Sequence, residues 1–267
     1  MPESHHQELA QVVAYMKSHW PSPVKPEWQV SLEKYPEILA QILEDFTKDA
    51  TKNKNLIRIA GLSGSGKTSQ ILPAVEAYCD AKKLNPVLIA ARRFVDYHPY
   101  KTEIKEEYGE ENLRKNTDEF STIMMFLALN ALTKEGYDII LDVTLLAPEV
   151  ESILLKMLRS NNYETMLLMI ATSPEVTNHF LKDRGWRHSK ETEQEFIRAT
   201  KAAINFYIEN FPELHTILWS VYDLDPIYHG EIKNALEIFN DYSNKTDLPP
   251  KNDDARREAK IQFLSKL

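Results

Sequence analysis

The chain of 267 residues carries a formal net charge of −8, with 43% hydrophobic and 27% charged residues, which is the composition of an ordinary globular protein. An acidic balance argues against binding to nucleic acid or to an anionic membrane surface, because both select for basic faces. No run of 18 or more apolar residues predicts a membrane-spanning helix, and the polar first residues are unlike a signal peptide, so we expect a cytoplasmic protein.

Helices are expected first along the chain. Apolar residues at helical spacing predict one helix over residues 4–19, and the proline-rich segment WPSPVKPEW then ends it. A second helix is predicted over YPEILAQILEDF, where Ile38, Ile42 and Phe46 fall on one face. We therefore expect an N-terminal helical extension over residues 1–50.

From residue 56 the pattern changes to short apolar runs that alternate with amphipathic helices. The runs are LIRIA (56–60), PVLIA (86–90), YDIILDV (137–143), ETMLLMIA (164–171) and HTILWSVYDL (215–224). Strands separated by helices pair in parallel, because each helix carries the chain back across the sheet. The expected fold class is α/β, with a five-stranded parallel sheet and helices on both faces.

Two further regions differ from this pattern in polarity. The mostly charged stretch KTEIKEEYGEENLRKNTDE (101–119) predicts a solvated loop or helix face. Residues 246–267 are interpreted as a polar C-terminal tail that finishes in a short helix. Residues 50–245 would then form the α/β domain.

GLSGSGKTS, residues 61–69, matches the phosphate-binding loop Gly-x-x-x-x-Gly-Lys-[Ser/Thr] at every fixed position. Glycines let the backbone turn so that successive N–H groups point at phosphate oxygens, and the following helix adds the positive end of its dipole. Lys67 is expected to reach the β- and γ-phosphates, and the Thr68 hydroxyl to bind Mg²⁺. An apolar run before the loop and a helix after it favour a P-loop kinase-like fold. The residues expected to bind ATP are Gly61, Ser63, Gly64, Ser65, Gly66, Lys67, Thr68 and Ser69.

Two later segments carry residues suited to the same chemistry. Asp142 ends the apolar run YDIILD, the place of an acid that holds Mg²⁺ or contacts a substrate; an acid that only caps a strand end is the alternative. In LKDRGWRHSKE, Arg184 and Arg187 are placed to neutralise charge on a transferred phosphoryl group, with a solvated basic turn as the alternative.

Together these segments resemble the zeta toxin family, P-loop kinases of toxin–antitoxin systems. The resemblance spans roughly residues 50–210 and includes GLSGSGKTS, the Phe94…His98-Pro99 segment, EGYDIILDVT and the DRGWRHSKE region, in the order of the family. It implies an ATP- and Mg²⁺-dependent kinase that phosphorylates UDP-N-acetylglucosamine. It also implies a helical antitoxin protein that blocks the ATP site.

The sequence departs from that family on the side of the phosphate acceptor. The family places an aspartate two residues before the phenylalanine, where it acts as base on the sugar hydroxyl, but this chain has Arg92, which cannot accept a proton at neutral pH. The substrate-binding acid of the family falls near Phe126, in a stretch with no acid, and an expected arginine is replaced by Leu146 or a neighbour. The acid after the strand is Asp142, where the family usually has glutamate.

Three interpretations remain open. In the first, the protein is an ATP- and Mg²⁺-dependent phosphotransferase for a small polar acceptor, with a nucleotide sugar as first guess and Asp96 or Asp142 as the base. In the second, it binds ATP without transferring phosphate and acts as a binding or regulatory module. In the third, the alignment around residues 90–99 is shifted and the usual activity persists. Asp96 lies four residues after Arg92, one turn of an α-helix, and is otherwise a surface carboxylate. The catalytic residues expected under the first interpretation are Lys67, Asp142, Arg184, Arg187 and Asp96, and the metal-binding residues are Thr68 and Asp142.

Overall fold

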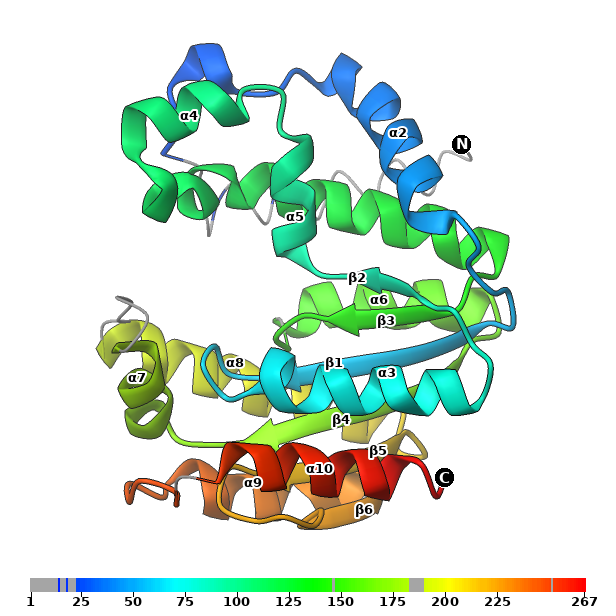
Figure 1. Cartoon of the computed structure of the whole chain (residues 1–267), viewed down its shortest axis with the longest axis vertical. Coiled ribbons are helices and arrows are strands. Elements are labelled where there is room, and N and C mark those ends of the chain that lie inside the picture. The colour runs from blue at the N-terminus through cyan, green and yellow to red at the C-terminus, as the bar shows by residue number, and fades with distance from the viewer. Residues whose placement is uncertain (1–13, 15–17, 19–22, 146, 183–189, 251) are drawn as a thin grey trace.

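Six strands form one sheet in the part of the chain that this computed structural model describes (Figure 1). The described residues are 14, 18, 23–145, 147–182, 190–250 and 252–267. The order across the sheet is β2-β3-β1-β4-β5-β6, so β1 is central and is paired on both edges. The strands are β1 (Asn55–Gly61), β2 (Val87–Ile89), β3 (Ile139–Asp142), β4 (Glu164–Ala171), β5 (His215–Ser220) and β6 (Tyr228–Glu231).

The sheet is parallel except at one edge. Strands β1 to β5 pair in parallel, and β6 pairs antiparallel with β5. The α/β class and the helices on both faces are confirmed, but the five-stranded, wholly parallel sheet expected from the sequence is wrong by this one strand. The four residues of β6 are half-buried or exposed, and they include Gly230. An edge strand of this kind contains no apolar run, which is the signal that revealed the other five.

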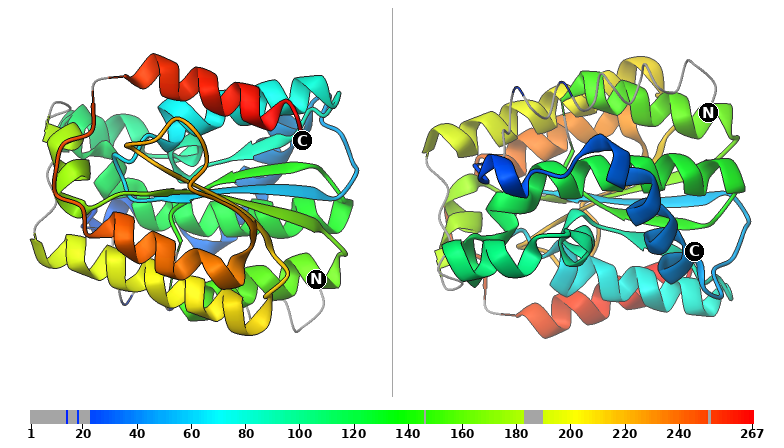
Figure 2. Two further views of the ribbon diagram at one scale, coloured as in Figure 1. Left: turned by 90° about the horizontal axis from the view of Figure 1, so that it is seen from below. Right: turned by 90° about the horizontal axis from the view of Figure 1, so that it is seen from above.

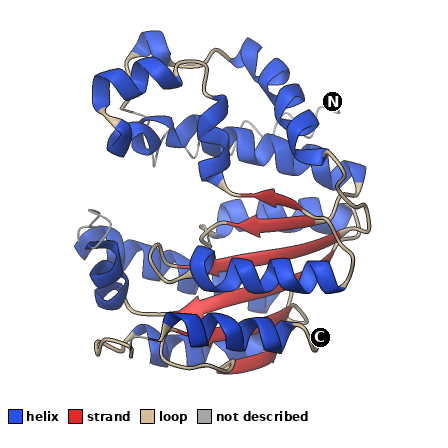
Figure 3. Cartoon of the chain, viewed as in Figure 1, coloured by secondary structure: helices blue, strands red, loops and turns tan. Residues whose placement is uncertain are grey.

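Helices cover both faces of the sheet, as Figures 2 and 3 show. On one face lie α3 (Leu72–Ala81) and α10 (Asp253–Leu264), and on the other lie α6 (Pro148–Ser160), α8 (Lys190–Asn210) and α9 (Ala235–Ser243). Successive residues of β4 enter the two cores alternately, because side chains along a strand point to opposite faces. None of the described helices is long and apolar enough to cross a membrane.

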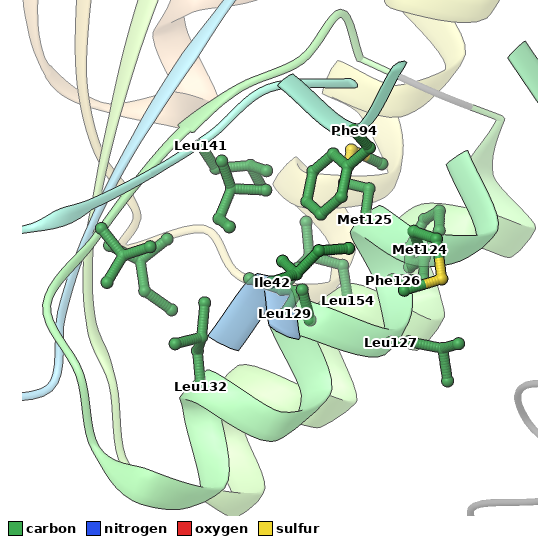
Figure 4. Close-up of a cluster of buried hydrophobic side chains, with 14 of the residues drawn as sticks. Ile42, Phe94, Met124, Met125, Phe126, Leu127, Leu129, Leu132, Leu141 and Leu154 are labelled. Atoms are coloured by element: carbon green, nitrogen blue, oxygen red, sulfur yellow. The ribbon is translucent and has the colours of Figure 1, made fainter. Parts of the chain in front are cut away.

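A further group of helices covers the β2 edge of the sheet (Figure 1). It consists of α2 (Tyr35–Thr47), α4 (Lys101–Tyr108), the long α5 (Glu110–Glu135) and the short 3₁₀ helix η4 (Ala91–Tyr97). Helix α5 packs directly against η4. Figure 4 shows the buried side chains that join them, among them Ile42, Phe94, Met124 and Leu129. This apolar contact fixes the polar faces of α5 and η4 relative to the ends of β2 and β3.

The sequence predicts two N-terminal helices, one on each side of the proline-rich segment, and a polar tail at the C-terminal end. Most of the expected helix over residues 4–19 lies outside the described residues, whereas α2 confirms the second helix. Residues 246–267 contain α10, which packs against α3 and buries Arg256, Lys260 and Leu264. The last helix is therefore part of the layer that covers one face of the sheet.

Candidate active site

The chain between β1 and the next helix forms a tight turn at the carboxyl end of the central strand. Gly64 and Gly66 have φ angles of +84° and +95°, which residues with a Cβ rarely adopt. A Cβ atom on Gly64 would lie 2.9 Å from the Leu181 Cγ and from the Thr177 carbonyl oxygen, both on α7 (Pro174–Lys182). The glycines of the predicted phosphate loop are thus required by the backbone conformation and by the close approach of α7.

The helix after the loop begins with a widened turn. Residues Lys67–Ile71 form the π turn η3, and the Leu72 N–H donates to the Lys67 carbonyl at its end. Pro73 explains the widening, because a proline has no N–H to give and its ring crowds the carbonyl four residues earlier. The N–H groups in the first turn of a helix have no acceptor within the helix and point out of its N-terminal end, so this end can bind an anion.

The Lys67 side chain lies inside the loop. Its Nζ donates to the carbonyl oxygens of Gly61, at 2.7 Å, and Leu62, at 3.0 Å. Burial is the main cause that lowers the pKa of Lys67 to about 8; the carboxylate of Asp142 opposes this shift, and two nearby arginines add to it. Because burial disfavours the ammonium ion, a phosphate group placed beside it would stabilise its charged form.

Thr68, Arg92 and Asp142 meet next to the loop. Asp142 ends β3 and is paired in register with Ile59 of β1. Its Oδ2 lies 3.5 Å from the Thr68 Oγ1 and 3.3 Å from the Arg92 Nη2, and the Arg92 Nη1 donates to the Thr68 Oγ1 at 3.0 Å. These contacts place an arginine, rather than a base, against the carboxylate.

The same group contains oxygen ligands for a divalent cation. The Oδ1 of Asp142 is buried and has no hydrogen-bond partner among the described residues. A hydroxyl oxygen and a carboxylate oxygen are the protein ligands that Mg²⁺ takes beside nucleotide phosphates. The oxygens of Thr68 and Asp142 therefore have the chemistry to hold Mg²⁺.

These side chains line a cleft of about 700 Å³ at the carboxyl ends of the strands. We call one wall of the cleft the phosphate-loop side and the other the α5 side. The phosphate-loop side comprises residues 63–70, Val221, Asp253 and Arg256, and the α5 side comprises Ala90, Ala91, Arg92, Arg114, Asp118, Thr122 and Met125. Asp142, Val143 and Thr144 lie at the strand end, and Phe180, Thr192 and Phe196 complete the lining.

The α5 side presents a polar stripe that the sequence analysis missed. Arg114, Asp118 and Thr122 are spaced by four residues, so they share one face of α5. The side chains of Arg114 and Asp118 are half-exposed, and the Arg114 Nε lies 3.6 Å from the Asp118 Oδ1. Burial within the cleft raises the pKa of Asp118, and Arg114 opposes the shift. The four-residue spacing of these side chains is visible in the sequence, but the charge of the stretch 101–119 predicts only a solvated loop or helix face.

Helix α10 contributes a second feature that the sequence did not indicate. The Gln70 Nε2 on η3 donates to the Asp253 Oδ1 at 3.1 Å, and the Arg256 Nη2 donates to the same oxygen at 2.7 Å. Arg256 is buried, and its Nε has no hydrogen-bond partner among the described residues. The π turn η3, which follows the phosphate loop, is thereby joined to α10.

The structure brings together most of the site residues predicted from the sequence. Residues 63–69 and Asp142 line the cleft, while Gly61 lies behind the loop and accepts hydrogen bonds from Lys67 and, at 3.3 Å, from the Thr144 Oγ1. Arg184 and Arg187 lie outside the described residues. Leu146, named as a substituted position, also lies outside them.

Asp96 is placed away from the cleft. Its side chain is 69% exposed, forms an ion pair with Lys101, and does not line the pocket. The segment that carries it is the 3₁₀ helix η4, with three residues per turn, so a residue four positions after Arg92 is rotated by about a third of a turn from it. The expectation that Asp96 faces the cleft assumed an α-helical turn.

A glycine turn after a central parallel strand, an inward lysine and a threonine–aspartate pair define the site as that of a P-loop protein. A sequence profile described as Zeta toxin matches residues 39–221, more than half of the chain. The chain belongs to the zeta toxin family.

Known proteins agree with this assignment. The toxin PezT of Streptococcus pneumoniae serotype 4 is 28% identical over 145 residues, which are 54% of this chain and 55% of PezT, so the match spans about half the length of that relative. A chain of the solved PezAT chromosomal toxin–antitoxin system of Streptococcus pneumoniae has a TM-score of 0.66 at 20% identity, covering 90% of this chain and 99% of that one. A chain of the AvrRxo1-ORF1:-ORF2 complex has a TM-score of 0.50 at 14% identity, covering 100% of this chain and 85% of that one. These structures share the fold.

Proposed function

We propose that the protein is an ATP- and Mg²⁺-dependent phosphotransferase that moves the γ-phosphoryl group to a hydroxyl of a small polar acceptor. The observation that carries this proposal is the cleft, in which a phosphate loop with an inward lysine faces a polar stripe on α5. A cleft with polar groups on both walls has room for a second substrate beside the nucleotide. Membership of the zeta toxin family supports the reaction class, and a nucleotide sugar remains the first guess for the acceptor.

The phosphate loop and the residues predicted to act with it have distinct roles in this proposal. The backbone of residues 63–68 binds the phosphate oxygens, and Lys67 turns from the carbonyls of Gly61 and Leu62 to the β- and γ-phosphates. Thr68 and Asp142 hold Mg²⁺, which neutralises charge on the β- and γ-phosphates when bound. Arg184 and Arg187 are proposed to stabilise charge on the transferred group.

A second candidate function is nucleotide binding without transfer. It is favoured by one observation: Arg92, which stands where the family resemblance expects the base, lies against Asp142 and Thr68. Under this alternative the closed arginine–aspartate contact persists with ATP bound. The protein would then act as a nucleotide-responsive binding module.

We also propose a protein partner that covers the cleft. The solved relatives come from a toxin–antitoxin system and from a two-protein complex, and the resemblance implies a helical antitoxin. Purified together with the protein encoded in the adjacent reading frame, the chain should lose measurable ATP binding. Unchanged ATP affinity in a stable complex would contradict a partner at this site.

The proposed activity is tested with labelled ATP. Incubating the protein with ATP labelled on its γ-phosphate, Mg²⁺ and a fractionated metabolite extract should give a labelled small-molecule product. Lys67→Ala should weaken ATP binding at least 30-fold, about 2 kcal/mol, because charge-assisted bonds to two phosphates are lost. Lys156→Ala on the exposed face of α6 is the matched control and should bind ATP like wild type.

The outcomes separate the two candidate functions. A labelled product that disappears in Lys67→Ala supports the phosphotransferase. Tight binding of ATP without any product supports the binding module. If Lys67→Ala binds ATP as tightly as wild type, the phosphate-loop assignment itself is wrong.

A further inference from the structure

The proposed reaction lacks a proton acceptor at the position where the family resemblance expects one. Arg92 occupies it, and a guanidinium stays protonated at any pH at which the protein is folded. Among the described residues that line the cleft, three carry a carboxylate: Asp118, Asp142 and Asp253. Within the described part of the chain, a carboxylate base that acts directly on the acceptor belongs to this set.

Two of the three carboxylates are engaged elsewhere. Asp142 lies against Thr68 and Arg92 next to the phosphate loop, where its oxygens suit the cation. Asp253 accepts hydrogen bonds from Gln70 and Arg256, and it lies on α10, which covers the α3 face of the sheet. Asp253 is thus held on the phosphate-loop side of the cleft, whereas the polar stripe belongs to α5 on the other side.

Asp118 has the position and the accessibility that a base requires. It lies on α5, which packs against the η4 helix that carries Arg92, and Arg92 in turn contacts Thr68. Its side chain is 47% exposed and faces the cleft. On the same stripe, Arg114 and Thr122 offer donors on either side of it. The apolar face of α5 is buried among Met124 and its neighbours, so the stripe is held in place (Figure 4).

We propose that Asp118 is the general base of this enzyme. The inference rests on the proposed phosphotransferase function. In the step, the acceptor hydroxyl gives its proton to the Asp118 carboxylate, and an oxygen lone pair forms the new bond to the γ-phosphorus. The bond from the γ-phosphorus to the β,γ-bridging oxygen breaks, and its electron pair leaves with ADP. Protonated Asp118 then releases the proton to water.

The surroundings of Asp118 favour this role. Desolvation raises its pKa above that of an ordinary aspartate, which makes it a better proton acceptor, and Arg114 opposes this shift. The charged side chains that share the cleft with it are Arg114 on α5, Arg92 on η4, Lys67 of the phosphate loop, Asp142 on β3, and Asp253 and Arg256 on α10. The arginines on its own side orient a polar acceptor beside it.

The test compares two aspartates. Asp118→Asn should lower the rate of phosphate transfer at least 100-fold, the usual contribution of a general base, with ATP affinity unchanged within two-fold. Asp96→Asn removes a carboxylate that is exposed and outside the cleft, and should keep the wild-type rate within two-fold. The rate of wild type should fall at acid pH as Asp118 is protonated, and this acid limb should be absent from the residual activity of Asp118→Asn. Asp118→Glu keeps the carboxylate and should recover part of the rate.

Each result has a separate meaning. If Asp118→Asn retains the rate within five-fold and keeps the acid limb, Asp118 is not the base, and the phosphotransferase remains. If Asp96→Asn loses the activity instead, the base lies on η4. Slow hydrolysis of ATP by water serves as a second readout. If wild type neither transfers phosphate nor hydrolyses ATP, the proposed function fails, and this role fails with it.

Discussion

The two sides of the cleft are built in different ways. The centre of the phosphate-loop side is the run of consecutive residues 63–70, whose shape depends on positive φ angles and on contact with α7. The α5 side is made of single side chains from two helices that are held together by an apolar cluster. A site formed by the main chain tolerates little change, because any substitution that alters the turn alters the binding groups. A site formed by side chains can be altered one residue at a time. Under the proposed function, this contrast accounts for a chain that keeps its phosphate loop and carries Arg92 where the family resemblance expects the base.

The largest effect is expected from a change to the backbone of the phosphate-loop side. Gly64→Ala places a methyl group 2.9 Å from two atoms of α7 at a φ of +84°, a strain of about 2 kcal/mol or more. We expect ATP affinity to fall at least 30-fold, measured by calorimetric titration. Ser63→Ala, which keeps the backbone, should bind ATP within three-fold of wild type. Equal affinities for the two variants would show that the loop adapts and would remove the contrast.

A second change tests a buried charge in α10, the helix that borders the phosphate-loop side. Lys260 is fully buried; its Nζ donates to the Arg256 carbonyl at 3.4 Å, and burial lowers its pKa to about 8. Below pH 8 the folded protein carries a buried charge that opposes folding, and between pH 8 and 10.5 the unfolded state binds more protons, so the free energy of unfolding rises with pH. Lys260→Met should therefore stabilise the protein by about 2 kcal/mol at pH 7.

Urea unfolding at pH 7 and at pH 9.5 measures this effect. The advantage of Lys260→Met should shrink at the higher pH, whereas Lys266→Met, at an exposed position, should change stability little at either pH. ATP affinity should stay within two-fold, because the cleft is untouched. A loss of stability in Lys260→Met would mean that the ammonium is solvated or paired in the folded protein.

The smallest effect is expected where the two sides meet. Arg92 belongs to η4 but contacts Thr68 and Asp142. Arg92→Ala should lower kcat/KM for transfer about five- to ten-fold, roughly 1 kcal/mol, while ATP affinity changes less than three-fold. Arg198→Ala, on the exposed surface of α8, is the control. A loss of ATP affinity above ten-fold would assign Arg92 to the phosphate-loop side.

The sequence predicts those elements of the fold whose burial requires a recognisable pattern of apolar residues. Strands β1 to β5 are covered on both faces, so each is an apolar run, and α2 shows a helical stripe that ends in the aromatic cluster of Phe46, Phe94 and Tyr97. Strand β6 is an edge strand without such a run. Asp96 would face the cleft beside Arg92 only if its segment were an α-helix, but η4 is a 3₁₀ helix and directs Asp96 elsewhere.

The site residues also fall into those that the sequence identifies and those that only the fold reveals. The phosphate loop is contiguous, so the order of its residues along the chain is enough to identify them. The contact between Arg92 and Asp142 joins positions far apart in the chain, and so does the hydrogen bond between Gln70 and Asp253. Asp118 could have been noticed, since Arg114, Asp118 and Thr122 repeat every four residues. Only the packing of α5 over the β2 edge shows that this face looks into the cleft rather than into solvent.

The hydrogen bond between Gln70 and Asp253 has a consequence for how the chain folds during its synthesis. A nascent chain that has exposed its glycine turn still lacks the segment carrying Arg256, which leaves the ribosome much later. Until that segment docks, one border of the cleft is missing. The order of translation therefore delays the finished cleft until residues 253–256 have been made.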